Sequence, residues 1–412
     1  MVQAQKNLSK SAGAESALKV HKLTFWEAAM IIVGANIGSG ILGLPFSARK
    51  AGWPILLVCL MIAGFFTTAS MLYVAETTLR TKKPMQLPGL ASRYVGNLGS
   101  WLAFFSVAAN TIGCLIAYTN GSGRILSEFL GVSTAFGSVL FTIPCVIVVW
   151  FGLKATGIAE KFISFGMIAL LAIIILASFL SSKASLANAI YVHWQYAVPV
   201  FNVAIFCYIA QYAVPELARG LAHDPQKLAP SIVTGMTITF VLLALVPLAV
   251  LSLTGPDQVT QVATISWGKA LGHWAFVVAN LFALCAMMTS YWAVAESFLT
   301  SIVDKFNFQS ETDFVTRIGC MIGIVLPPFL LAYSGMVSFV DAIYLAGTFG
   351  GVIMSILPVM MLHSSRKHGD MEPAWSCGWI ASTSVQAVMI LLFCGAAVYA
   401  MVGLFGLLPA AW

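Results

Sequence analysis

Charged residues are scarce in this chain. Only 9% of its 412 residues are Asp, Glu, Lys or Arg, whereas 59% are hydrophobic. A soluble protein of this length needs more polar surface than so few charged residues provide. The shortage excludes a water-soluble domain and predicts an integral membrane protein.

Several chemical signatures are also missing from the sequence. The chain has no nucleotide-binding P-loop, and its six histidines lack cysteines or carboxylates at metal-ligand spacing. Seven of the eight cysteines fall inside apolar segments, as small packing residues do, and form no disulfide framework. The apolar segments also lack the clustered acids and bases of a membrane enzyme. We therefore expect no enzymatic activity, no metal centre, no cofactor and no ATP-driven pump.

Long apolar segments dominate the rest of the chain. Eleven of them are long enough to cross about 30 Å of hydrocarbon as helices that rise about 1.5 Å per residue. They predict an all-α membrane fold with 11 transmembrane helices. The segments are residues 25–48, 53–79, 98–127, 134–152, 159–181, 196–218, 231–254, 274–302, 316–334, 337–362 and 380–406.

The positive charges are unevenly distributed between the predicted loops. With the amino terminus inside, 16 of the 21 Lys and Arg residues lie on the cytoplasmic side. This bias follows the positive-inside rule and supports a cytoplasmic amino terminus and an external carboxyl terminus. The net charge of +6 then reflects topology, so we expect no nucleic-acid partner.

The first apolar segment holds glycine where a membrane helix usually holds strong helix formers. Residues 33–45 include four glycines and a proline, and each glycine inside a helix costs about 1 kcal/mol relative to alanine. One interpretation is a helix that unwinds at mid-membrane and exposes backbone groups to an ion and a carboxylate. The other is a close helix contact through small residues at four-residue spacing.

The sixth segment is interrupted as well. Pro199 and Pro215 lie near its ends, and Pro215 lacks the amide that would bond to the carbonyl of Gln211. The first and sixth segments cross the membrane in opposite directions, a pattern typical of inverted-repeat secondary transporters. We predict a cytoplasmic tail, a repeat of helices 1–5, a repeat of helices 6–10, and a final loop with helix 11, at residues 1–22, 23–181, 182–362 and 363–412.

The stretch from Gly34 to Pro45, followed by Trp53 and Glu76, resembles the amino acid/auxin permease group of the APC superfamily. Within that group it is most similar to bacterial aromatic and hydroxy amino acid permeases. The resemblance implies a LeuT-type fold with 5+5 inverted repeats, broken helices 1 and 6, and an eleventh helix. It also implies ion-coupled amino acid uptake across the bacterial inner membrane. The sixth segment departs from many relatives because its middle has no glycine.

The resemblance further implies a substrate site between the two broken helices. The first amides of the second half-helix would bind the substrate carboxylate, which agrees with the dipole and the free N–H groups at a helix start. Asn36 would accept a hydrogen bond from the ammonium group, or it would only bond to a neighbouring helix. Aromatic members would face the substrate side chain or serve packing. The predicted set is Asn36, Ser39, Gly40, Ile41, Phe206, Cys207, Tyr208 and Gln211.

A cation site is implied beside it. Thr289 and Ser290, with carbonyls of Gly34 and Ile37, resemble a sodium site between the first and eighth helices, and hydroxyl and carbonyl oxygens suit a hard cation. The same hydroxyls can instead bond to carbonyls of their own helix. If the coupling ion is a proton, Glu296 is a candidate carrier or gate, because it follows Thr289 by two helical turns. Its alternative role is an ion pair with a cytoplasmic Lys or Arg.

The sequence as a whole predicts a secondary active transporter that imports a neutral amino acid together with H+ or Na+. Few charges lie near the broken helices, and a charged substrate would need a buried counter-charge. Aromatic residues in the sixth and eighth segments favour an aromatic substrate. The alternatives are a small hydroxy or aliphatic amino acid such as serine, threonine or alanine, or a membrane channel. We expect the substrate and membrane lipid as partners, and no obligate protein partner.

Overall fold

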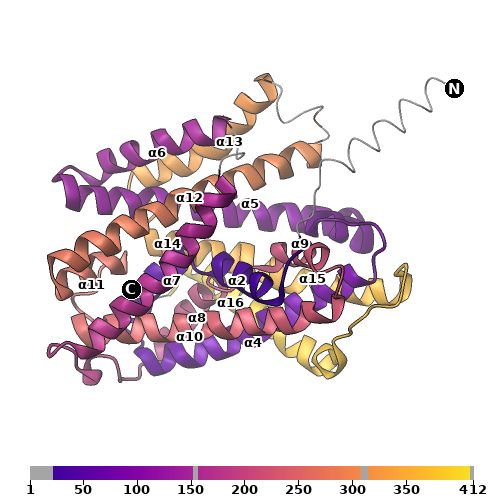
Figure 1. The fold of residues 1–412 in the computed structure, drawn as a ribbon, viewed down its shortest axis with the longest axis horizontal. Coiled ribbons are helices and arrows are strands. Elements are labelled where there is room, and N and C mark those ends of the chain that lie inside the picture. The colour runs from indigo at the N-terminus through magenta and orange to yellow at the C-terminus, as the bar shows by residue number, and fades with distance from the viewer. Residues whose placement is uncertain (1–21, 152–155, 307, 309–313, 409–412) are drawn as a thin grey trace.

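The computed structural model describes residues 22–151, 156–306, 308 and 314–408, and these residues form helices joined by short connections (Figure 1). The predicted tail lies outside the described residues except for its last residue, Lys22. The first half contains α2 (Phe25–Asn36), α3 (Ser39–Ala48), α4 (Trp53–Leu79), α5 (Leu87–Leu130), α6 (Thr134–Phe151) and α7 (Thr156–Leu180).

The second half is longer and more fragmented. Its α-helices are α8 (Ala197–Phe206), α9 (Val214–Gly220), α10 (Leu228–Thr254), α11 (Ala263–Leu271), α12 (His273–Phe306), α13 (Phe314–Tyr333), α14 (Phe339–Leu345), α15 (Val352–His368) and α16 (Thr383–Leu404). The short turns are η1 (Leu186–Asn188), η2 (Trp194–Tyr196), η3 (Gln211–Ala213), η4 (Pro225–Lys227), the π-helical η5 (Ala346–Gly351) and η6 (Gly378–Ala381).

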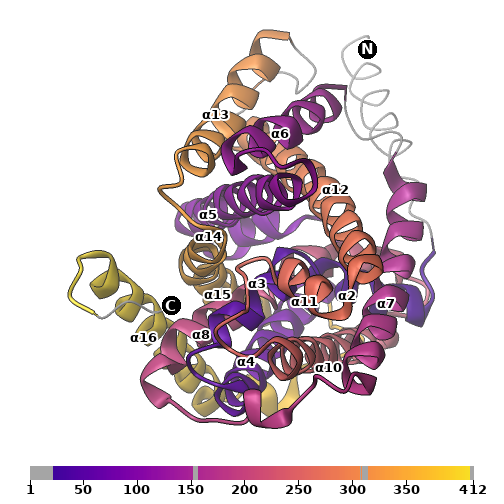
Figure 2. The ribbon, with the colours of Figure 1, turned by 90° about the vertical axis from the view of Figure 1, so that its left-hand side faces the viewer.

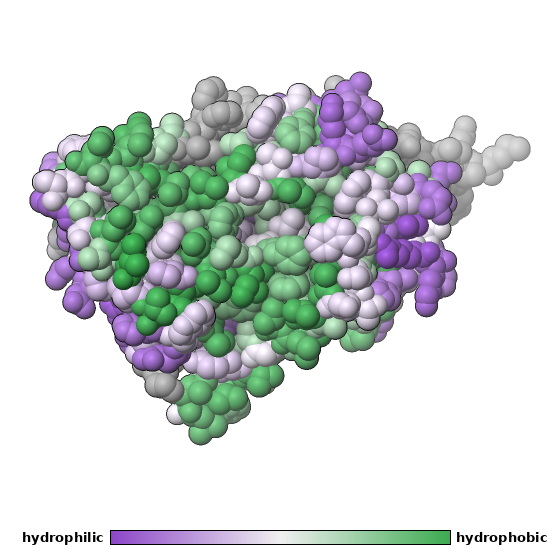
Figure 3. Space-filling view, turned by 90° about the horizontal axis from the view of Figure 1, so that it is seen from below, coloured by the Kyte–Doolittle hydropathy of each residue, from purple (hydrophilic) through white to green (hydrophobic). Residues whose placement is uncertain are grey.

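Eight helices in the described ranges are long and apolar enough to cross a membrane, and the bent pair α2 and α3 adds a ninth. The predicted fourth and fifth segments coincide with the shorter apolar helices Thr134–Trp150 and Ala169–Leu180. Each of the eleven predicted segments therefore falls on an apolar helix, while the number of spans stays a prediction. Figure 3 shows apolar residues over the middle of one face, with hydrophilic residues gathered at its two ends.

The first predicted span is broken where the glycines lie. Helix α2 begins with a capping box, in which the Glu27 amide donates to the Thr24 hydroxyl and the Thr24 amide to the Glu27 carboxylate. It ends at Asn36, α3 begins at Ser39, and the two axes differ by 53°. The prediction of an interrupted first helix is confirmed.

The sixth predicted span is broken as well, although its middle contains no glycine. Helix α8 ends at Phe206, residues 207–210 lie outside any helix, and η3 leads into α9. Pro215 is the second residue of α9, where its missing amide would have no partner in the helix anyway. The proline thus starts a new helix, and the interruption begins at residue 207, before the Gln211 carbonyl whose bond Pro215 cannot make.

Two other predicted spans differ in detail from a single regular helix. Gly96 has a positive φ of 70°, which separates the first turns of α5 from the long helix that follows. The expected tenth span is divided into α14, the π-helical η5 and α15. A π-helical turn leaves the usual backbone ladder and is frequent at functional sites.

The broken helices lie in the interior of the bundle. Figure 2 shows α2 and α3 between α4, α8, α10, α11 and α12, whereas α13 and α16 lie at the periphery. All ten residues of α3 are buried. Helix α3 packs against α8, α10 and α14, and α2 packs against α10. A helix start that is enclosed by other helices can present its backbone groups to a bound molecule instead of to lipid.

Candidate functional site

Gly40 lies where the two broken helices meet. A Cβ atom added to it would lie 2.6 Å from Sγ of Cys207 and 3.2 Å from Cδ1 of Phe206. No real side chain tolerates the shorter distance, so only glycine allows α3 to approach the end of α8 this closely. The structure therefore brings Gly40, Phe206 and Cys207 together, as the predicted site requires.

Gly38 is different, although it belongs to the same stretch. It precedes α3 as the N-cap residue and makes no side-chain cap. A Cβ atom added to it would meet one neighbour at an ordinary distance, 3.8 Å from the Tyr118 hydroxyl. The two interpretations of the glycine-rich stretch thus apply to different glycines, because Gly40 serves close packing while Gly38 borders open space.

The start of α3 supplies free backbone N–H donors beside the open space at Gly38. Ser39, Gly40 and Ile41 are the first three residues of the helix, so their amides have no acceptor one turn earlier. Such amides and the helix dipole together favour an anion such as a carboxylate. The arrangement can therefore hold a carboxylate at the break, close to the unwound end of α8.

Several buried polar atoms near the two breaks have no hydrogen-bond partner in the described part of the chain. They are Oδ1 of Asn36, Oγ of Ser39, the Tyr208 hydroxyl, and both Nε2 and Oε1 of Gln211. Asn36, Ser39, Tyr208 and Gln211 are all buried. Buried polar atoms in proteins are nearly always paired, and unpaired ones near a helix break are groups that a bound molecule can satisfy.

Asn36 bonds to a neighbouring helix, and its predicted contact with an ammonium group stays a prediction. Its amide nitrogen lies 3.3 Å from Sδ of Met236 and 3.4 Å from the Thr239 hydroxyl, both on α10. Its oxygen is the atom that has no partner among the described residues. The nitrogen thus joins two helices, and the oxygen is the part of the side chain that can accept from an ammonium group.

Tyr208 contacts α4. A Cβ atom added to Gly64, in the middle of α4, would lie 3.1 Å from the Tyr208 hydroxyl. The ring therefore packs against the second span, and the predicted contact with a substrate side chain stays a prediction for this residue.

Tyr118 is a further residue near the first break, and the sequence did not predict its position there. It lies on α5, is only 4% exposed, and its hydroxyl faces Gly38. The side chains of Cys114 and Ser290 interact with it. A single tyrosine in an apolar helix usually serves packing, so only the folded chain shows that it joins α5, α12 and the break of the first span.

The residues of the predicted cation site occupy mixed environments. The Thr289 hydroxyl donates to carbonyls of its own helix, at 3.2 Å from Cys285 and 3.0 Å from Ala286. Ile37 is buried, whereas Gly34 is exposed at the end of α2. Among the described residues, no three His, Cys, Asp or Glu side chains gather as metal ligands. A sodium role for Gly34, Ile37, Thr289 and Ser290 therefore stays a prediction.

Glu296 lies in an ion pair. Its Oε2 is 3.5 Å from Nη2 of Arg317 on α13, and both side chains are largely buried. Arg317 also donates to the carbonyls of Val149 and Trp150, at 2.6 and 3.1 Å. The pair joins α12 and α13 to the end of α6. This environment is the alternative that the sequence left open, and a proton-carrying role stays a prediction.

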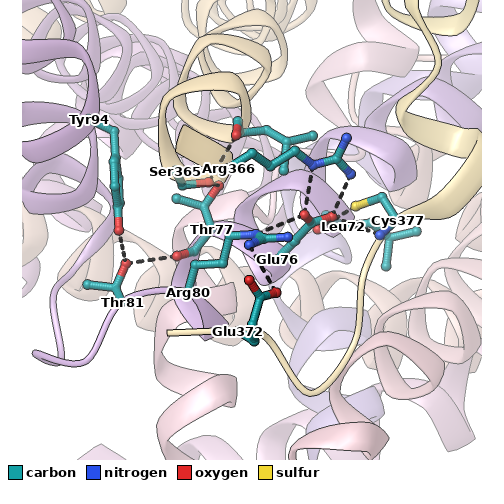
Figure 4. A network of polar contacts seen from close by, with 11 residues as sticks. Leu72, Glu76, Thr77, Arg80, Thr81, Tyr94, Ser365, Arg366, Glu372 and Cys377 are labelled. Atoms are coloured by element: carbon teal, nitrogen blue, oxygen red, sulfur yellow. Dashed lines mark hydrogen bonds and ion pairs between the residues drawn. The ribbon is translucent and has the colours of Figure 1, made fainter. Parts of the chain in front are cut away.

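A second polar centre lies at the C-terminal end of α4 (Figure 4). The Glu76 side chain is 0% exposed and accepts two hydrogen bonds from Arg366, at 2.8 and 2.9 Å. Nε of Arg80 lies 3.0 Å from the same carboxylate, and the amide of Cys377 donates to it at 2.8 Å. Such bidentate charged pairs are strong and directional. They join α4, α15 and the loop that precedes α16.

That loop, residues 369–382, has a second attachment. The carboxylate of Asp370 accepts from the Lys82 amide at 2.9 Å and from Arg93 at 2.6 Å. The Lys82 amide and the Arg93 guanidinium hold the pKa of Asp370 below its ordinary value, because both favour the charged carboxylate. We refer to Glu76, Arg80, Arg366 and Cys377 with Asp370 as the loop anchor.

The sequence is similar to characterised transport proteins. It is 23% identical over 353 residues to tyrosine-specific transport system 1 of Haemophilus influenzae, covering 82% of this chain and 87% of that protein. It is 24% identical over 375 residues to the tryptophan-specific transport protein of the same organism, with the same coverage. Glutamine transporter 2 of Aliivibrio fischeri is 20% identical over 337 residues, covering 77% of this chain and 86% of that protein.

The fold also matches a solved transporter. The crystal structure of the Eremococcus coleocola manganese transporter, in complex with an aromatic bis-isothiourea substituted compound, has a TM-score of 0.61 and 13% sequence identity. The match covers 94% of this chain and 88% of the other. At this identity it supports the fold alone, as that of a helical membrane transporter.

A family profile covers nearly all of the chain. The match runs from residue 21 to residue 402 and includes both broken helices and the loop anchor. These features describe a membrane transport protein and not an enzyme. The chain belongs to the tryptophan/tyrosine permease family.

Proposed function

We propose that this protein imports a neutral aromatic L-amino acid across the bacterial inner membrane, by symport with a proton or a sodium ion. The named specificities of its relatives, tyrosine and tryptophan, support an aromatic substrate. The amino terminus lies in the cytoplasm and the carboxyl terminus outside, in agreement with the distribution of Lys and Arg.

The observation that carries the proposal is the meeting of the two breaks. The free amides of Ser39, Gly40 and Ile41 lie beside the end of α8, and the unpaired oxygen of Asn36 lies at the end of α2. A carboxylate at the amides and an ammonium at Asn36 are the two charged groups of an amino acid. The buried amide of Gln211 supplies a further polar contact near the substrate.

The positions of the breaks support a LeuT-type fold with 5+5 inverted repeats and 11 spans. They fall in the first and sixth apolar segments, which lie at corresponding positions of the two halves. Such repeats place the substrate at mid-membrane and expose it to each side in turn. One positive charge moving down about 100 mV provides about 2.3 kcal/mol, which supports roughly fifty-fold accumulation.

Uptake into proteoliposomes tests the proposal. Labelled tryptophan, tyrosine, serine, alanine and glutamine are offered to the purified protein while sodium and proton gradients are imposed one at a time. We expect tryptophan or tyrosine to accumulate under one gradient. If sodium drives uptake, Thr289→Ala removes the sodium dependence, whereas Thr237→Ala does not. Thr237 is a matched control, because its hydroxyl also bonds to a carbonyl of its own helix, at 2.8 Å, and it is exposed.

Other outcomes would overturn specific parts of the proposal. Accumulation of serine or alanine without aromatic amino acids would assign a small hydroxy or aliphatic substrate. Flux that only follows the substrate gradient would indicate a channel. The absence of uptake of every amino acid under both gradients would show that the proposed function is wrong.

A further inference from the structure

An apolar pocket adjoins the first break. It lies between α3, α7, α11 and α12 and encloses about 390 Å³ free of protein atoms, its open side included. Gly38 and Ile41 form its inner wall, and Leu171, Trp267 and Ala283 lie on the other helices. None of the lining residues carries a charge. No role predicted from the sequence involves this space.

The pocket shares its inner wall with the carboxylate position. Ile41 contributes one of the three free amides of α3, and its side chain lines the pocket. Side chains of a helix lean toward its amino-terminal end, which places that of Ile41 over the break. In an aromatic amino acid only two carbon atoms separate the carboxylate from the ring. A substrate held at the amides can therefore place its ring directly in this pocket.

The walls suit a planar apolar group. Phe282 and Trp267 supply aromatic surface, and Ala283 and Ala286 leave a shallow face on α12. Aromatic side chains pack favourably against other rings and gain from the apolar area they bury. The Trp267 nitrogen already donates to the Ser178 hydroxyl at 2.6 Å, so this ring is fixed in place.

Thr264 is the lining residue that carries a hydroxyl group. Its hydroxyl donates to Oδ1 of Asn280 at 2.9 Å, and Nδ2 of Asn280 donates back to the Thr264 carbonyl at 3.3 Å. The hydroxyl proton is therefore committed, and the oxygen keeps a lone pair for a further donor. It can accept from an indole N–H or a phenol O–H, whereas a phenyl ring has no such hydrogen.

We propose that this pocket receives the aromatic ring of the substrate, and that Thr264 accepts a hydrogen bond from the polar hydrogen of the ring. The inference rests on the proposed function and assigns the side-chain site to α3, α7, α11 and α12, away from Phe206 and Tyr208. It makes Ala283 and Thr264 determinants of specificity.

The pocket must widen before a ring enters it. In this conformation the space holds little more than water, which is too little for a ring. Leu171 faces the pocket, while Leu176 on the same helix is 62% exposed on the outside of the bundle. Helix α7 also packs against α10 and α12, and its Ser178 accepts the hydrogen bond from Trp267, so a shift of α7 would have to break or carry along this bond.

Filling the pocket tests its role. We expect Ala283→Leu to weaken tryptophan binding about tenfold or more, since a pocket that excludes a group of this size discriminates by such factors. Adding Leu171→Ala should restore binding by returning the volume. Ala172→Leu is the control, because Ala172 follows Leu171 in α7 but is exposed. Binding is measured by competition with labelled tryptophan on purified protein.

Thr264→Val gives an independent test that does not depend on packing. We expect it to weaken binding of tryptophan and tyrosine about tenfold, through the loss of one hydrogen bond, and to leave phenylalanine unchanged. Thr264→Ser keeps the hydroxyl and should keep the affinity for all three. The unchanged phenylalanine affinity shows that each variant is folded.

The outcomes separate this proposal from the proposed function. If the unmodified protein binds no aromatic amino acid, the proposed function fails. If it binds tryptophan and Ala283→Leu binds equally well, the ring lies elsewhere and the pocket assignment is overturned. An equal loss for phenylalanine and tryptophan in Thr264→Val would overturn the hydrogen bond to the ring.

Discussion

The loop anchor and the region around the two helix breaks both bury polar groups. These groups are paired in the loop anchor, whereas several at the breaks have no partner among the described residues. In the loop anchor the Glu76 carboxylate forms short bonds to Arg80, Arg366 and the Cys377 amide. At the breaks, Asn36 and Gln211 keep polar atoms that have no partner within the described residues. A paired buried group stabilises the fold, whereas an unpaired one weakens it and stays available to a substrate. The contrast separates the part that holds the bundle together from the part that binds.

Breaking the loop anchor should have the largest effect on stability. Glu76→Ala removes a fully buried carboxylate together with its bonds to Arg80, Arg366 and the Cys377 amide, and each hydrogen bond to a charged group is worth about 1.5–3 kcal/mol. We expect a large fall in the thermal midpoint of the purified protein in detergent. Glu372→Ala is the control, because Glu372 is 95% exposed and lies 3.6 Å from Arg80. An unchanged thermal midpoint in Glu76→Ala would show that the loop anchor does not stabilise the fold.

Substitutions of Gly40 and Gly38 at the first break should have different effects on stability and on substrate binding. Gly40→Val forces a side chain against Cys207, so we expect loss of uptake and a loss of stability of about 1–3 kcal/mol from overpacking. Gly38→Ala meets only the Tyr118 hydroxyl at 3.8 Å, so stability should stay within about 0.5 kcal/mol. Gly38 precedes the free amides and lines the pocket, so a methyl group there takes up space beside the proposed substrate position, and we expect tryptophan affinity to fall about tenfold.

Thermal midpoints and tryptophan binding measured on the same preparations check this pair. Equal stability losses in both variants would show that Gly38 also serves packing. Full uptake by Gly40→Val would mean that the approach of α3 to α8 is not needed for transport.

Removal of an unpaired group should have opposite effects on stability and binding. Gln211→Met keeps the shape of the side chain and removes two buried polar atoms that have no partner in the described chain. Because the folded protein loses no hydrogen bond, we expect stability to rise by about 1 kcal/mol while substrate affinity falls. Gln386→Met is the control, since Gln386 is buried and donates to the Ala381 carbonyl at 3.1 Å, so its loss should destabilise. A loss of stability in Gln211→Met would show that the Gln211 amide stabilises the folded protein, and this would contradict the difference drawn between the loop anchor and the helix breaks.

The smallest effect should come from titration of Asp370 in the loop anchor. Its pKa is lowered in the folded protein, so its contribution to stability is complete above the ordinary pKa of about 3.9 and is lost as the pH falls through the lower folded value. We expect a slight additional fall of the thermal midpoint below about pH 4. Asp370→Asn should lack this part of the pH dependence, which midpoints recorded between about pH 3 and pH 7 would reveal.

The sequence predicted the two broken helices better than the contacts between distant segments. The glycines around Gly38 and the proline at Pro215 are local causes of broken helices, because they act on the backbone of their own segment. The breaks at residues 37–38 and 207–210 were therefore foreseeable, although Pro215 acts by starting α9. The roles of Gly38 and Gly40 were not distinguishable, since only their neighbours in space differ.

Contacts between distant segments lay beyond local patterns. Tyr118 reaches the site from α5, and the apolar pocket draws on four helices from α3 to α12. Glu76 was visible as a charged residue near the end of an apolar segment, but its bond to Arg366 joins residues 290 positions apart. No periodicity within one helix carries that information.

The sequence by itself determined that the chain enters a membrane, where its helices lie and where two of them break. These properties follow from apolar length and from backbone chemistry, which act within one segment. Only the tertiary structure decided which polar atoms found partners and which did not. That choice depends on helices that are far apart in the chain and adjacent in space, and it separates the anchored end of the bundle from the site at its centre.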